Sequence, residues 1–121
     1  MRSAAFLLLL FGSQALASPF LDAKECEHWV VFVHQIGVLR DNGVPQAQAD
    51  KYTEDFIAAD RASKPPLLIR DEQDAEFARS GPGSIYSHEE LPTERIMENM
   101  RQYCMRSVAL RDLLITPYPV Y

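Results

Sequence analysis

The sequence contains none of the short motifs that mark the common kinds of enzyme site. No serine stands in the G-x-S-x-G turn of an α/β-hydrolase. The stretch Gly81-Pro82-Gly83 places a proline where a phosphate-binding loop needs a backbone N–H. The two cysteines, Cys26 and Cys104, do not have the C-x-x-C spacing of a redox pair. We therefore predict no catalytic residue and no cofactor, and a protein that is not an enzyme.

Positive charge is scarce as well. The chain has 12 Lys and Arg residues against 17 Asp and Glu residues, and its net charge is −5. Binding to nucleic acid depends on neutralising phosphates, so this composition argues against a nucleic-acid partner. An excess of negative charge instead fits an exported protein whose copies repel one another in solution.

The chain also lacks a long hydrophobic run. The apolar stretch Ala4–Phe11 is far shorter than the roughly 20 residues that a membrane-spanning helix needs. It follows the positive charge of Arg2 and precedes the A-x-A sequence Ala15-Leu16-Ala17, which is the pattern of a secretory signal peptide. We therefore predict a signal peptide over residues 1–17, and a mature chain that is periplasmic or secreted and not stably inserted in a membrane.

Two cysteines in an exported chain are expected to form a disulfide. An oxidising compartment favours a bond between Cys26 and Cys104. Two thiols alone are too few for a structural zinc site. The bond would close a loop of about 78 residues, for which the chain-entropy model gives roughly 4–5 kcal/mol of stabilisation.

The strongest helix signal runs from Ala23 to Asp41. Asp22 is a good N-cap, and Glu25 completes a capping-box pattern. Asn42-Gly43 provides a natural stop, because glycine tolerates the left-handed conformation that follows a last turn. Apolar residues at helical spacing line one face and spread beyond it, so we expect this helix to be central in a bundle.

Three more helices are predicted, over residues 45–62, 66–78 and 92–108. Pro45, Pro66 and Pro92 each suit a first helical turn. We expect residues 80–83 to break the chain and residues 84–87 to form a separate turn. The sequence therefore predicts an all-α, four-helix domain over residues 18–108, stapled by one disulfide. The bond is geometrically reasonable if the first and last helices pack roughly antiparallel.

The segment from Ala109 to Tyr121 is apolar, and Pro117 and Pro119 exclude helix near its end. Three arrangements are open for this C-terminal tail. It could wrap back onto the bundle, it could fray, or it could form an arm that docks a partner.

The histidines do not predict a metal site. Glu25 and His28 form an E-x-x-H pair, but the carboxylate-bridged metal bundles need a second pair, which the chain lacks. His34 is expected at an outer edge of the first helix. His88 lies beside two carboxylates in a loop before the last helix, and could bind a metal or sense pH. We favour a solvated loop there, and predict no metal ligand.

A set of short motifs resembles a family of small exported proteins from Gram-negative bacteria. Cys26 lies early on an apolar helix that ends in Arg40-Asp41-Asn42-Gly43-Val44, an R-D-x-G-V turn. An aromatic Ile85-Tyr86 step and a final Cys104 follow. The resemblance covers Cys26 to Cys104 and implies a periplasmic helical protein with two cysteines. It implies no catalytic residue, because the family has no established activity.

These observations favour a protein-interaction module of unknown partner, such as an immunity or accessory protein. The expected binding surface consists of outer apolar residues of the first helix and of the tail: Val31, Phe32, Val38, Leu39, Leu114, Tyr118 and Tyr121. The partner is an unidentified protein, and a homodimer is also open. Two alternatives are open: a periplasmic chaperone that responds to acid or stress, and a small metal-binding protein or hydrolase.

Overall fold

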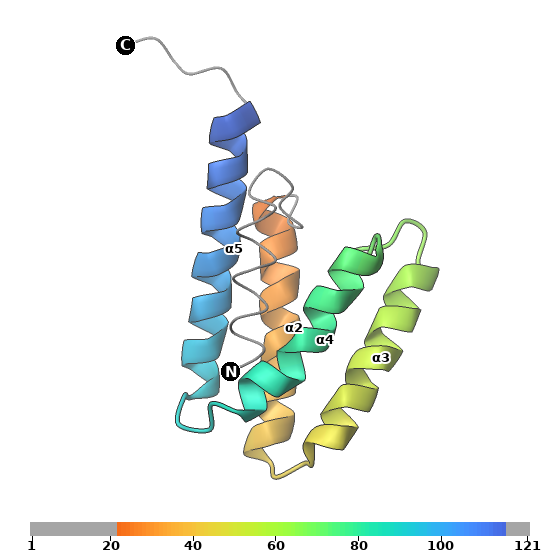
Figure 1. The fold of residues 1–121 in the computed structure, drawn as a ribbon, viewed down its shortest axis with the longest axis vertical. Helices are drawn as coiled ribbons and strands as arrows, with labels where there is room; N and C mark the ends of the chain where they lie inside the picture. Colours follow the sequence, from red (N-terminus) through yellow and green to blue (C-terminus); the bar gives the residue numbers. More distant parts are fainter. Residues whose placement is uncertain (1–21, 116–121) are drawn as a thin grey trace.

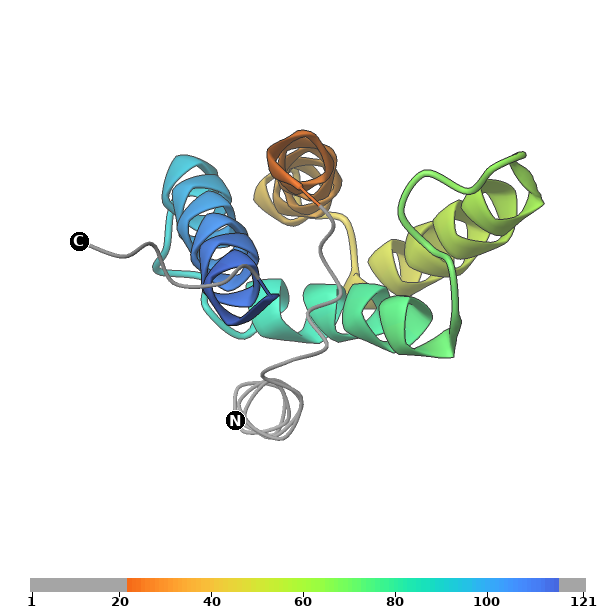
Figure 2. The same cartoon turned by 90° about the horizontal axis from the view of Figure 1, so that it is seen from above.

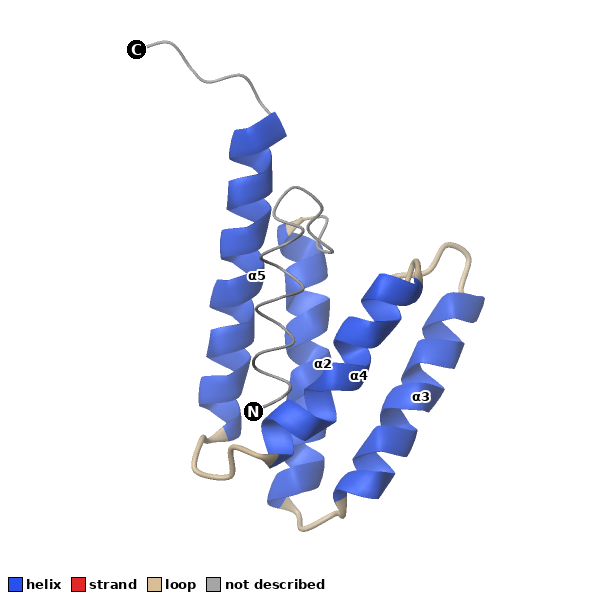
Figure 3. Cartoon of the chain, viewed as in Figure 1, coloured by secondary structure: helices blue, strands red, loops and turns tan. Residues whose placement is uncertain are grey.

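The fold is a bundle of four helices, as the sequence predicts. The computed structural model describes residues 22–115, and their side chains as far as Leu110. The helices are α2 (Ala23–Asp41), α3 (Gln46–Ala62), α4 (Glu72–Tyr86) and α5 (Thr93–Ile115), shown in Figures 1 and 3. None of them, within the described range, is long and apolar enough to span a membrane.

Helix α2 is the centre of the arrangement. It packs against α5 along most of its length, and the two run antiparallel (Figure 1). Seen from above, α2 lies between α5 and α3, while α4 crosses to one side of it and packs against α3 (Figure 2). The side of α2 that faces away from α4 is covered by no other described helix.

The core explains why α2 is apolar on most of its surface. Trp29 is fully buried and its ring meets Phe77 of α4 edge to face, with the centroids 4.9 Å apart. One turn on, Phe32 is buried against Phe56 of α3, at a centroid distance of 4.8 Å. Edge-to-face and offset ring pairs stabilise a core beyond the area that they bury. The helix therefore has apolar partners on three sides.

The caps of α2 lie where the sequence places them. The side chain of Asp22 accepts a hydrogen bond of 2.9 Å from the backbone N–H of Glu25. At the other end Gly43 has a positive φ of 77°, which glycine adopts without strain. Helix α3 begins at Gln46, so Pro45 is its N-cap and not its first helical residue.

The predicted third helix, over residues 66–78, is wrong at both ends. Asp60 of α3 accepts hydrogen bonds from the backbone N–H groups of Leu68 and Ile69 and holds both residues in a buried, non-helical connection. Helix α4 begins only after Asp71, whose side chain accepts from the N–H of Asp74.

Helix α4 then continues through Pro82 to Tyr86, across the predicted break at residues 80–83. Pro82 lacks the N–H that a helix uses, yet its ring is fully buried, and Ile85 beyond it is 5% exposed. Gly81 allows α4 to approach Phe32 of α2 closely, since a Cβ there would lie 3.2 Å from the ring. Burial of the last turn outweighs the local preference to break.

Helix α5 is also longer than predicted. It reaches Ile115, seven residues beyond the expected end at Val108. Pro117 is the nearest helix-breaking residue in the sequence, and it disfavours helix in the residue before it. The first part of the predicted tail is therefore helical, whereas residues 116–121 lie outside the described range.

Candidate functional site

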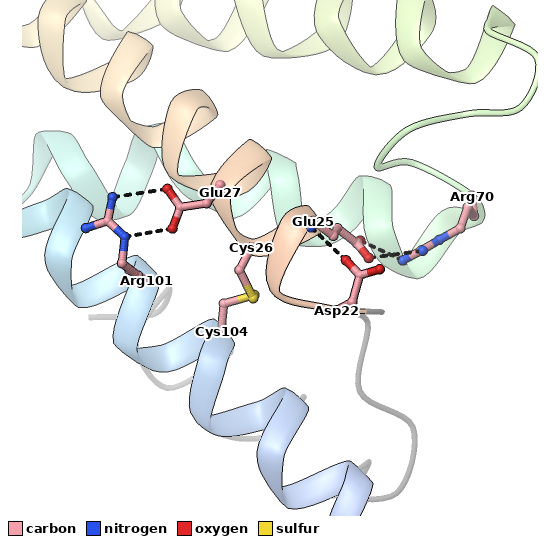
Figure 4. Close-up of a disulfide and its surroundings, with 7 residues drawn as sticks. All are labelled: Asp22, Glu25, Cys26, Glu27, Arg70, Arg101 and Cys104. Carbon is pink, nitrogen blue, oxygen red and sulfur yellow. Dashed lines mark hydrogen bonds and ion pairs between the residues drawn. A yellow bond between two sulfur atoms is a disulfide. The ribbon is translucent and has the colours of Figure 1, made fainter.

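The disulfide joins the start of α2 to α5 (Figure 4). Cys26 and Cys104 are fully buried, and their Cα atoms are 5.6 Å apart. Beside the bond, Arg101 of α5 forms two hydrogen bonds with the carboxylate of Glu27, at 2.8 and 3.2 Å. The Arg101 guanidinium lowers the pKa of Glu27. The predicted disulfide is confirmed, and its surroundings hold two helices together.

A partly buried ion pair lies on the other side of the same helix start. Arg70 donates to both oxygens of Glu25, at 2.8 and 3.2 Å, and Glu25 is 5% exposed (Figure 4). Asp74 accepts from the Arg70 backbone N–H at 3.0 Å, and burial raises the pKa of Asp74. One guanidinium thus fixes the connection before α4 against α2, which is a structural role.

The R-D-x-G-V turn binds residues of α4, of the following connection and of α5. The guanidinium of Arg40, whose side chain is 7% exposed, donates to the carbonyl oxygens of Ile85, His88 and Leu91, at 2.8–3.2 Å. The side chain of Asp41 accepts from the hydroxyl of Thr93, the first residue of α5. We name Arg40, Asp41 and these partners the Arg40 corner.

Both residues bind a distant part of the chain. Their partners lie in the last turn of α4, in the connection that follows and at the start of α5, 45–52 residues away. Their role is structural, and it spans three elements.

A partly open pocket of about 260 Å³ lies next to the Arg40 corner, between the end of α4 and the first turns of α5. Its walls combine three apolar side chains with three polar ones. They are Ile85, Leu91 and Ile96, and Ser84, His88 and Asn99. Pockets that mix apolar walls with a few convergent polar groups are the usual form of small-ligand sites.

His88 has a defined orientation in this pocket. Its Nδ1 lies 2.8 Å from the carbonyl oxygen of Ser84 and 3.2 Å from the hydroxyl of Ser87. A carbonyl oxygen only accepts, so Nδ1 carries a proton, and in the neutral form of the ring Nε2 is then the acceptor. No hydrogen bond to His88 Nε2 occurs from residues 22–110.

Only some of the α2 residues predicted to bind a partner are exposed. Val31 is 57% exposed on the uncovered side of α2. Phe32 is 3% exposed and belongs to the core, so its assignment to a binding surface is wrong. Val38 and Leu39 are half-buried, and Leu39 packs against the core. The α2 part of the predicted surface therefore shrinks to Val31 and the edge of Val38.

The predicted binding residues of the C-terminal tail lie in α5 or beyond the described residues. Leu114 lies within α5, and its side chain is outside the described set, as are Tyr118 and Tyr121 altogether. Ile115 is 11 residues beyond Cys104, whereas Ala23 is three residues before Cys26. At 1.5 Å per residue, α5 extends about 12 Å past the start of α2, as Figure 1 shows. We name this projecting end, residues 109–115, the α5 overhang.

The histidines and acids do not assemble into a larger cluster. Glu25 of the E-x-x-H pair binds Arg70. Within residues 22–110, no three His, Cys, Asp or Glu side chains lie where they could hold one metal ion. His88 lines the pocket and is half-buried rather than fully solvated.

Sequence reasoning missed the pocket and the roles of Arg70 and Arg40. The pocket depends on α4 continuing through Pro82, which the local sequence argues against. The capping-box pattern of Asp22 and Glu25 pointed to a helix start, and it carried no signal for a partner as distant as Arg70.

In comparisons with known proteins, no protein-family model, no curated protein and no solved structure matches the chain. The resemblance to small exported two-cysteine proteins therefore stays a prediction.

Proposed function

We propose that this chain is a small secreted or periplasmic protein-interaction module, which binds its partner through the α5 overhang. The disulfide is consistent with an oxidising compartment. The observation that carries the proposal is the overhang itself, because α5 continues past the helix that covers the rest of its length.

The chemistry of the overhang supports a protein partner. Four of its seven residues are large and apolar: Leu110, Leu113, Leu114 and Ile115. Leu110 is 48% exposed, and Met105, just before the overhang, is 40% exposed. Recognition helices present apolar anchors at such spacings to a groove on the partner. A partner groove, or a second copy of this chain, would remove the exposed side chains of Met105 and Leu110 from water.

The test is capture of a stoichiometric partner from periplasmic extract by the oxidised mature chain, residues 18–121. The variant Leu110→Glu with Leu114→Glu adds two charges to the overhang. A matched control, Ala47→Glu with Gln48→Glu, adds two charges to exposed positions of α3. We expect the control to keep the partner and the overhang variant to lose at least tenfold in affinity, with unchanged helix content.

If the overhang variant still binds the partner with wild-type affinity, the overhang is not the interface. A wild-type chain that captures no stoichiometric partner, but binds a hydrophobic dye near pH 3 and suppresses aggregation of unrelated proteins, would be the acid-responsive chaperone.

A further inference from the structure

The pocket between α4 and α5 has the construction of a ligand site, and it lies at the opposite end of α5 from the overhang. We infer that it binds a small neutral molecule with an apolar ring and one hydroxyl group, of the size of a substituted phenol. This inference does not depend on the proposed interaction function.

The loop beside the pocket is held too firmly to close it. Arg40 binds the carbonyl oxygen of Ile85 in the last turn of α4 and those of His88 and Leu91 in that loop. Thr93 is bonded to Asp41, and the hydroxyl of Tyr86 donates to the carbonyl of Val44 at 2.7 Å. An apolar hollow with mobile walls would collapse to regain packing contacts. Walls anchored on both sides keep it open.

The volume of the pocket sets the size of the ligand. An apolar cavity of about 150 Å³ is enough to hold benzene in another protein. The present pocket, at about 260 Å³, has room for one ring with a substituent. The side chains of Ile85, Leu91 and Ile96 provide the apolar contact for such a ring.

The polar groups of the pocket select the head group of the ligand. The bond from Nδ1 to the Ser84 carbonyl leaves His88 Nε2 as an acceptor, so a ligand that donates a hydrogen bond is preferred. Asn99 and Ser84 add an amide and a hydroxyl to the lining, which can donate to the oxygen of the same ligand group. A hydroxyl both donates and accepts. An uncharged Nε2 that accepts a hydrogen bond has no proton to offer an anion, so a neutral donor is favoured.

The experiment is a titration of the ¹⁵N-labelled, oxidised mature chain with p-cresol, followed by amide chemical shifts. We expect saturable shifts confined to residues 84–91 and 96–99. The methyl ether 4-methylanisole has the same ring without the donor, and it should bind at least threefold more weakly, the loss of one hydrogen bond. Equal affinities would overturn the assignment of the head group.

Two pairs of variants locate the site. Asn99→Trp should fill the pocket and abolish binding, whereas Gln102→Trp, one turn along α5 and exposed, should bind p-cresol as the wild type does. His88→Phe should remove the preference for p-cresol over its ether, and His34→Phe should keep it. Shifts that do not saturate, or that centre on Val31 and Leu110, would show general partitioning onto apolar surface and overturn the inference.

Discussion

At the scale of single residues, Arg40 is the side chain on which most of the local structure depends. It is nearly buried, and its fork of N–H groups donates to three carbonyl oxygens, one in the last turn of α4 and two in the segment that joins α4 to α5. A lysine keeps the charge but presents a single point of donation instead of a planar fork. We predict that Arg40→Lys lowers the free energy of unfolding by about 2 kcal/mol. Urea titration measures this loss, and Arg106→Lys, exposed on α5, should change stability by less than about 0.5 kcal/mol.

Replacing glycine by alanine should have opposite effects on stability at two positions, Gly37 and Gly83. A Cβ on Gly37 of α2 would lie 2.7 Å from both the Oγ1 and the Cγ2 of Thr93, which is closer than side chains pack. Gly37→Ala should therefore destabilise the protein by about 1–3 kcal/mol. A Cβ on Gly83 of α4 would meet only Gln46, at 3.8 Å. Gly83→Ala should stabilise by about 0.5–1 kcal/mol, because alanine loses less conformational freedom in a helix.

Thermal or urea unfolding of the two alanine variants tests this pair. The combination Gly37→Ala with Thr93→Ala relieves the clash but removes the bond to Asp41, so it should recover only part of the loss. Equal effects of the two alanines would mean that α2 and α5 do not approach closely at Gly37.

At the scale of elements, the start of α4 contains a carboxylate that responds to pH in an unusual direction. The pKa of Asp74 is raised, chiefly because burial disfavours the charged carboxylate. The folded state therefore holds this proton more tightly than the unfolded state does. The resulting stabilisation is fully present below the unfolded pKa of about 3.9 and is lost as the pH rises through the folded pKa. We predict that Asp74→Asn is more destabilising at pH 3 than at pH 7.

Other carboxylates act in the opposite direction. The pKa of Asp41 is lowered by the hydroxyl of Thr93, and the pKa of Glu72 is lowered by hydrogen bonds from Arg79 and Arg61. Their stabilisation is lost as the pH falls through their folded pKa values. Asp41→Asn should thus be less destabilising at pH 3 than at pH 7. Urea titrations at the two pH values give both differences, and effects of the same sign would contradict the assignment of Asp74.

The elements also show what the sequence could and could not predict. Helix α2 was predicted with its bounds because the Asp22 cap, the apolar spacing and Gly43 all act locally. The start of α4 was mispredicted because Asp60, a residue of α3, holds Leu68 and Ile69 out of the helix. Its continuation through Pro82 depends on burial against other helices, which no local rule for proline contains.

Among the candidate sites, too, the sequence predicted some features and missed others. The disulfide followed from compartment and parity, without any geometry. The binding surface was drawn too widely, because periodicity shows that a residue is apolar but not which neighbour covers it, and Phe56 covers Phe32. The pocket unites residues from α4, the following loop and α5 around a corner held by Arg40. Arg40 lies 45–51 residues before the carbonyl groups that it binds, and no spacing in the sequence predicts these contacts.

At the scale of the whole molecule, α5 has one main neighbour. Its packing is almost entirely against α2, while α3 and α4 form the other side of the bundle (Figure 2). A helix with a single partner is the element that opens most easily, because it buries the least on its other faces. The bond between Cys26 and Cys104 lies where α5 would otherwise separate from the start of α2.

Removing the disulfide should therefore affect α5 before it affects the rest. We predict that Cys26→Ala with Cys104→Ala lowers the free energy of unfolding by about 4 kcal/mol, given the sequence separation of 78 residues. Urea titration measures the loss, and hydrogen exchange should show α5 losing amide protection before α4. Reduction of the wild-type chain should reproduce both effects, which separates the lost bond from the two lost side chains. Uniform loss of protection in all four helices would instead show that the bond stabilises the bundle as a single cooperative unit.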